Sequence, residues 1–201
     1  DPDASGFSNT GTLRAEGPQP LTLNDGSFQL NATTIEVLDG SKLVTNTGVT
    51  IANGSLDTQG AGVIDLGSGT TLDTITLTTG SLANIFNNRF VTITNSLNNN
   101  GTLNLAGSLS PTRITFNGPT TALNGTGELV LSNTGANQVT APGATLTHAL
   151  NHTLRGAGNL LRNESGMNNA GTIIAQGSNP LIIDPDASGF SNTGTLRAEG
   201  P

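Results

Sequence analysis

Short runs in which apolar and polar residues alternate recur along the whole chain. Typical runs are Leu21–Leu23 and Ile114–Phe116. Alternation with a period of two is typical of a β-strand that buries one face. The runs are separated by tight-turn pairs such as Asp39–Gly40 and Asn124–Gly125, and helical periodicity is nearly absent. The pattern therefore predicts an all-β protein built from many short strands.

The same eighteen residues, DPDASGFSNTGTLRAEGP, stand at Asp1–Pro18 and again at Asp184–Pro201. The offset between the two copies is 184 − 1 = 183 residues. We interpret residues 1–201 as one segment that contains a 183-residue tandem repeat (1–183) and the first 18 residues of the next (184–201). The sequence then predicts a longer tandem array, in which each unit contacts neighbouring repeats of the same chain.

Weaker copies of this stretch lie inside the unit. Asn9–Leu13, Asn99–Leu103 and Asn169–Ile173 share the pattern Asn-x-Gly-Thr followed by an aliphatic residue, and further apolar runs follow each copy. Three short strands in each turn of roughly 20–23 residues are typical of a parallel β-helix. We therefore predict a right-handed, single-stranded parallel β-helix (a β-solenoid) of about nine turns. Because Asn-Gly pairs are also typical of hairpins, an antiparallel sandwich is the alternative.

Composition narrows the range of partners. Charged residues make up 10% of the chain, the net charge is −7, and there is no cysteine, tryptophan or tyrosine. The seven cations are scattered, so nothing resembles a phosphate-binding stripe and we expect no nucleic-acid partner. No apolar run is long enough for membrane insertion. Without cysteine, stability must come from the backbone ladder and the core.

One motif offers oxygen ligands for a metal. Asp-x-Asp-x-Ser-Gly matches the first half of a calcium-binding loop, but the glutamate expected at position twelve is replaced by Thr195 in the second copy. A polar turn is the structural alternative, and we predict no other cofactor. The weak calcium candidates are Asp1, Asp3, Ser5, Asp184, Asp186 and Ser188.

Other polar residues give little indication of catalysis. Asp57, Asp65 and Asp73 recur every eight residues without a neighbouring cation, so we expect no acid–base pair and no enzyme activity. His148 and His152 have a metal-binding spacing only on a helix. In extended chain they would lie about 13 Å apart. We therefore predict two surface histidines at a corner.

Three phrases resemble passages in very large bacterial surface proteins: Asn192–Gly200, Asn168–Ala175 and His152–Gly158. These proteins are autotransporter-type and filamentous-haemagglutinin-like exoproteins. The resemblance is loose and covers most of the chain in style. It implies a right-handed parallel β-helix, an extracellular position on the bacterial cell surface, and a role in adhesion or as a rigid stalk. It assigns no binding residue.

The function expected from these observations is mechanical, namely a stiff spacer in a giant exported adhesin. One alternative is a direct adhesive face for a host surface or matrix. Others are a carbohydrate-active β-helix and an ice-binding solenoid, the last suggested by outward threonines at Thr74–Thr78 and Thr92–Thr94. No capping element is evident, so we also expect head-to-tail self-association of this segment.

Overall fold

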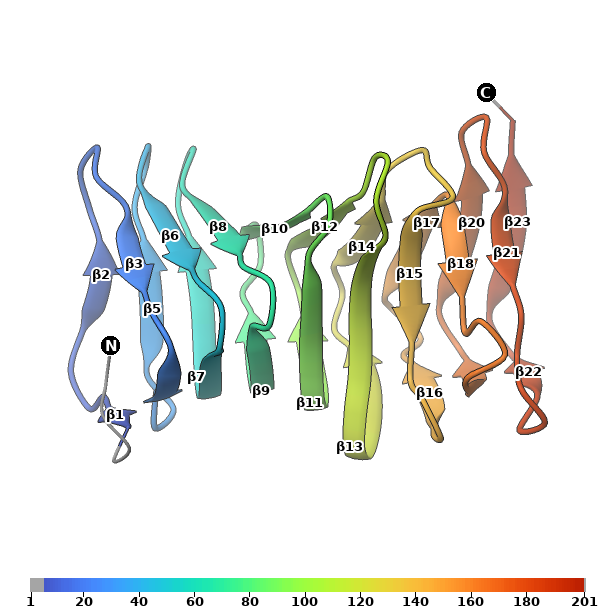
Figure 1. Cartoon of the computed structure of the whole chain (residues 1–201), viewed down its shortest axis with the longest axis horizontal. Coiled ribbons are helices and arrows are strands. Elements are labelled where there is room, and N and C mark those ends of the chain that lie inside the picture. The colour runs from blue at the N-terminus through green and yellow to red at the C-terminus, as the bar shows by residue number, and fades with distance from the viewer. Residues whose placement is uncertain (1–5, 201) are drawn as a thin grey trace.

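The protein is a β-solenoid of about nine turns. The computed structural model describes residues 6–200, which form strands and no helix. Every strand pair within these residues is parallel. Each circuit passes along three faces, and the strands rise at the back and descend at the front as the chain advances to the right (Figure 1). The coil is therefore right-handed, the predicted parallel β-helix is confirmed, and the antiparallel sandwich is excluded.

The faces are numbered 1 to 3 in the order in which the chain visits them. Faces 1 and 2 form one 14-stranded sheet, because β7, β9, β11 and β13 continue around the edge between them, whereas face 3 is a separate nine-stranded sheet. Face 1 consists of β1 (Phe7–Ser8), β4 (Gly26–Gln29), the first parts of β7 (Val49–Thr58), β9 (Thr71–Leu77), β11 (Phe90–Asn99) and β13 (Thr112–Asn124), and β15 (Asn137–Thr140), β18 (Gly158–Leu160) and β21 (Leu181–Ile183). Face 2 consists of β2 (Leu13–Ala15), β5 (Thr34–Val37), the second parts of the same four long strands, and β16 (Thr145–His148), β19 (Gly166–Asn169) and β22 (Phe190–Asn192). Face 3 consists of β3 (Leu21–Leu23), β6 (Lys42–Thr45), β8 (Val63–Leu66), β10 (Leu82–Phe86), β12 (Thr102–Ala106), β14 (Glu128–Leu131), β17 (Thr153–Gly156), β20 (Thr172–Gln176) and β23 (Thr195–Glu199).

Inward side chains stack in columns along the axis. On face 1, Phe28, Ile51, Leu72, Ile93 and Phe116 are in register, and none is more than 6% exposed. Burying each such side chain contributes about 1.5–3 kcal/mol. The alternation read from the sequence is therefore the alternation between this core and the outer surface.

Outward side chains pair between successive turns. Arg14 on β2 forms an ion pair with Glu36 on β5 at 2.6 Å, and Asn104 on β12 donates a hydrogen bond to Asn84 on β10 at 3.0 Å. Exposed ion pairs of this kind contribute at most about 1 kcal/mol. Surface pairs therefore add little to the free energy of unfolding, which comes mainly from the core and the backbone hydrogen bonds.

At the edge between faces 1 and 2, each of the four long strands has one residue with a left-handed backbone. Asn53 has φ 58°, Thr74 φ 53°, Asn95 φ 67° and Gly118 φ 114° at this edge. Asparagine and glycine tolerate this conformation, and Asn95 also donates to Asp73 Oδ1 at 2.7 Å. A β-branched residue there is strained, so Thr74 is the exception in this series.

We predict that Thr74→Asn stabilises the protein by about 1 kcal/mol, because the left-handed conformation costs a β-branched residue roughly this much more. Urea unfolding followed by circular dichroism measures the change. Thr76→Asn, two residues further along β9, is the matched control and should leave stability within about 0.5 kcal/mol. Equal effects of the two substitutions would show that the edge conformation is not the cause.

Candidate functional site

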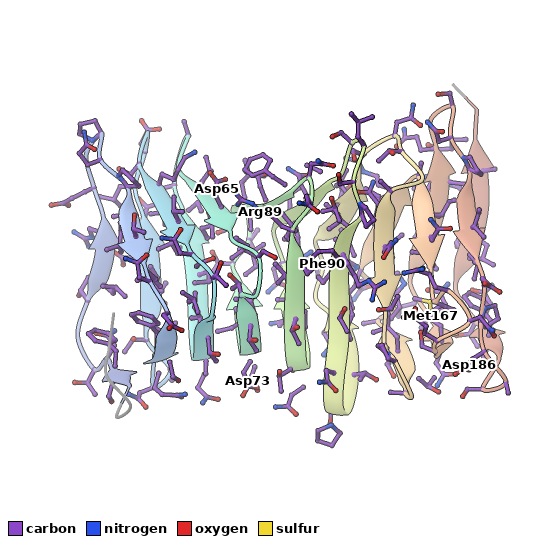
Figure 2. All side chains as sticks on the ribbon, in the orientation of Figure 1. Asp65, Asp73, Arg89, Phe90, Met167 and Asp186 are labelled. Atoms are coloured by element: carbon purple, nitrogen blue, oxygen red, sulfur yellow. The ribbon has the colours of Figure 1, made fainter. Side chains whose placement is uncertain are left out.

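The three evenly spaced aspartates lie on three different faces. Asp57 is on face 2, Asp65 on face 3 and Asp73 on face 1, and Figure 2 places Asp65 near the upper edge and Asp73 near the lower edge. Asp65 is 7% exposed and pairs with Lys42 Nζ at 2.7 Å. These carboxylates therefore do not form an acid–base pair.

The calcium candidates fall into two groups. Asp1, Asp3 and Ser5 lie outside the described residues. In the second copy, Asp184 and Ser188 are exposed, and the Asp186 carboxylate accepts a hydrogen bond from the Ser188 backbone N–H at 2.7 Å. This contact closes a polar turn, which is the structural alternative given above. Residues 6–200 contain no group of three or more side chains suited to a metal, and the calcium site stays a prediction.

The prediction of two surface histidines was wrong. His148 and His152 are both 0% exposed, and His148 Nε2 lies 2.9 Å from His152 Nδ1. The chain between them is not extended: the His152 backbone N–H donates to Ala149 O at 3.1 Å, so the segment turns back on itself. The two rings therefore meet inside the edge between faces 2 and 3, in an edge-to-face arrangement.

The histidines belong to a hydrogen-bond chain that runs along the axis, buried from Asn99 to Asn169 and ending at the exposed Asn192. Asn99 Nδ2 lies 3.0 Å from His152 Nε2, His148 Nδ1 lies 2.6 Å from Asn169 Oδ1, and Asn169 Nδ2 lies 2.7 Å from Asn192 Oδ1. The side-chain Nδ2 groups of Asn99 and Asn169 can only donate, so they fix the direction of every hydrogen bond in the chain. Each neutral histidine then donates through Nδ1 and accepts through Nε2, so every nitrogen has a partner. The chain is fully satisfied only when both rings are neutral.

Burial holds the rings in that neutral state. Burial, and to a lesser extent the charge that His148 would carry, lowers the pKa of His152 to about 3 from the usual 6.5. Burial also lowers the pKa of His148, and its hydrogen bond to Asn169 opposes that shift. Protonation of either ring at Nε2 would also point its new N–H at a neighbouring N–H donor, that of His152 Nδ1 or of Asn99 Nδ2. The pair is therefore structural, and no face of it is open to a ligand.

The neighbouring turns show why only one turn carries this pair. The position of His152 is occupied by Gly127 in the turn before and by Gly171 in the turn after. A Cβ on Gly127 would lie 2.0 Å from Gly101 O, so a side chain is excluded there. The edge has five residues in the histidine turn, as it has in the turn before (Leu123–Gly127), and three in the turn after (Asn169–Gly171). Leu150, at the tip of the histidine turn, is 71% exposed. The pair therefore depends on the two histidine side chains and not on the length of the edge alone.

An exposed patch lies on the edge between faces 3 and 1. We call Phe86, Arg89, Phe90 and Leu109 the edge patch; the three apolar residues are 40%, 44% and 95% exposed. The Arg89 guanidinium lies 5.3 Å from the centre of the Phe86 ring, a cation–π contact. Figure 2 labels Arg89 and Phe90 in the middle turns. This patch was not predicted from the sequence, although Phe86 and Phe90 flank a polar run that interrupts the alternation.

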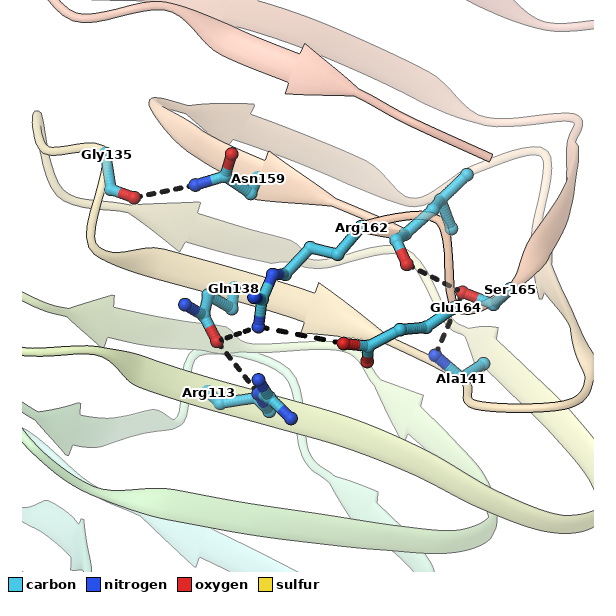
Figure 3. Close-up of polar contacts among 9 residues, drawn as sticks. Arg113, Gly135, Gln138, Ala141, Asn159, Arg162, Glu164 and Ser165 are labelled. Carbon is cyan, nitrogen blue, oxygen red and sulfur yellow. Dashed lines mark hydrogen bonds and ion pairs between the residues drawn. The ribbon is translucent and has the colours of Figure 1, made fainter. Parts of the chain in front are cut away.

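Arginines extend along face 1 beside the edge patch. Arg113 is in register with Phe90, and its Nε donates to Gln138 Oε1 at 2.8 Å (Figure 3). Arg162 donates to the same oxygen at 2.8 Å and approaches Glu164 at 3.8 Å. Neither Arg89 nor Arg113 forms an ion pair within residues 6–200. The edge patch therefore joins apolar and cationic groups on an otherwise acidic chain.

Two further surface features, a groove between faces 1 and 2 and the threonines of face 1, do not form an array of ligand-binding groups. A shallow groove of 580 Å³ on the edge between faces 1 and 2 is lined by Asn31, Asn53 and Thr76, among others, and carries no charged group. Ice binding needs two parallel columns of threonine, and within residues 6–200 face 1 provides one. That column is Thr50, Thr71, Thr92 and Thr115, and the column beside it is Ala52, Asp73, Thr94 and Asn117.

No family model, curated protein or solved structure matches the chain. Because residues 6–200 contain no helix, they also contain none that could cross a membrane. The histidine pair and the edge patch are therefore interpreted from their own geometry alone.

We predict that the free energy of unfolding falls as the pH decreases from 6.5 to 5. In this range the unfolded chain protonates its histidines, whereas the folded protein keeps His152 neutral down to about pH 3. The loss per histidine is up to about 1.4 kcal/mol for each pH unit. Urea unfolding at a series of pH values measures it, and this window lies above the titration of ordinary carboxylates.

The control carries His148→Asn and His152→Gly, the residues found at Asn169 and Gly171 in the next turn. Its stability should be flat over the same range of pH. A wild-type protein that is equally insensitive to pH would contradict the buried neutral pair.

Proposed function

We propose that the 183-residue unit is a structural repeat of a large exported bacterial surface protein, in which it acts as a rigid spacer. The observation that carries the proposal is the parallel ladder, which runs without a break across all three faces from the first turn to the last. A solenoid of this kind transmits force through backbone hydrogen bonds and a continuous core. The position on the cell surface is supported by the resemblance to bacterial exoproteins.

The surface chemistry also favours a mechanical role. The aspartates lie apart on three faces, the histidines are buried as a satisfied pair, and the groove between faces 1 and 2 is shallow and uncharged. None of these features concentrates charge or reactive groups in a cleft. We therefore include no catalytic activity in the proposal.

Direct adhesion is the second candidate, and the edge patch is the observation that favours it. Phe86, Phe90 and Leu109 expose apolar surface next to the guanidiniums of Arg89 and Arg113, which form no ion pair within residues 6–200. A partner with apolar groups beside anionic ones fits this combination.

A display experiment distinguishes the two functions. Arrays of one to four units are anchored on a cell or bead, and each carries a known binding domain at its far end. A spacer predicts that capture of a ligand buried in a polymer brush increases with the number of units. Replacing the units by an unrelated solenoid of equal length should preserve this capture.

The same arrays without the terminal domain test direct adhesion. A spacer predicts no attachment to host cells or matrix. Attachment that is lost in a Phe90→Ser, Leu109→Ser double variant would instead support the adhesive face. Attachment would have to persist in a Thr126→Ala control, since Thr126 is exposed on a different edge.

A further inference from the structure

The two identical copies occupy different faces of the solenoid. In the first copy, Phe7 lies in β1 on face 1 and Leu13 in β2 on face 2. In the second copy, the equivalent Phe190 lies in β22 on face 2 and Leu196 in β23 on face 3. The strand ladders place β1 in the first turn and β22 in the ninth. The 183-residue unit therefore spans eight turns and one additional face, or eight and one third turns.

The twist of the stack offsets this additional face. In Figure 1 the front of the molecule is formed by the face 3 strands β3, β6 and β8 at the left and by the face 1 strands β15, β18 and β21 at the right. The two copies consequently lie alike in space: β1 and β22 are both at the lower edge, and β2 and β23 both rise at the back. The stack has turned back by one face over the length of the unit.

The size of this twist is ordinary for a sheet. Neighbouring strands are rotated by roughly 10–35° in a fixed sense, so about 15° for each of eight steps gives a third of a turn. Strands one turn apart are separated by about 4.8 Å, so eight and one third turns advance by about 40 Å along the axis. The additional third of a turn in the coil and the opposite rotation of the stack through strand twist therefore cancel over one unit.

We propose that a tandem array of this unit repeats by translation, so that each surface feature returns to the same side of the rod about 40 Å further along. This proposal rests on the tandem array of the proposed function. All copies of the edge patch then form one line on one side, whereas an untwisted stack would place successive copies on different sides. Such a line fits an extended partner surface that carries many copies of one ligand, and it gains avidity from every unit.

Spin-label distances in the 201-residue chain test the geometry, since the chain contains no cysteine. The first pair is Ser8→Cys with Ser191→Cys, which are identical positions of the two copies and are both exposed. The second pair is Ser8→Cys with Ile182→Cys, which joins two exposed residues of face 1. The compensated twist predicts about 40 Å for the first pair and a longer distance for the second. An untwisted stack predicts the reverse order, and that result would overturn the proposal.

A two-unit protein, residues 1–183 followed by residues 1–201, tests the array itself. Spin labels on Leu109→Cys and on the same substitution in the second unit should again be about 40 Å apart. Correct distances in the single chain with a different distance here would contradict the tandem array and leave the unit geometry intact. Urea midpoints of the labelled proteins, compared with the unlabelled chain, show that each variant is folded.

Discussion

The parallel backbone ladder is the constraint on which the rest of this structure depends. Each strand must place its N–H and C=O groups opposite those of the strand one turn away, because an unpaired backbone group in the core is costly. The chain therefore returns to the same three faces on every circuit. Inward residues then stack on inward residues, as Ile51, Leu72 and Ile93 do, and the stacking stabilises the register that produced it.

Variation is confined to the edges because the ladder excludes it from the faces. The edge between faces 2 and 3 takes three residues at Asn169–Gly171 and five at His148–His152, yet the strands on either side stay in register. At the last position of the edge only glycine fits against the backbone of the previous turn, both in the five-residue edge that ends at Gly127 and in the three-residue edge that ends at Gly171. In the edge His148–His152, two neutral histidines complete a chain of donors and acceptors along the axis. A local insertion thus becomes a buried polar network without disturbing the coil.

Alternation and repetition were sufficient to predict the coil, because a period of two identifies the inward residue of every strand. They could not predict the edges, where contacts join residues one or more turns apart. The histidine pair was misassigned because its geometry depends on a turn at Ala149–Asn151 that brings two rings together. The edge patch was missed because Phe86 and Phe90 lie at strand ends, where the alternation no longer indicates which side chains point inward. Nor does sequence identity determine the face: Asn9 lies at the edge between faces 1 and 2, and its copy Asn192 lies at the edge between faces 2 and 3.

The proposed mechanical role follows from the same ladder, because a coil that adds turns grows in length and not in width. Small-angle X-ray scattering of proteins with one, two and three units tests this most directly. A continuous solenoid predicts an unchanged cross-sectional radius and an increase in length of about 40 Å for each added unit. A cross-section that grows with the number of units, or a length that does not, would contradict the continuous solenoid.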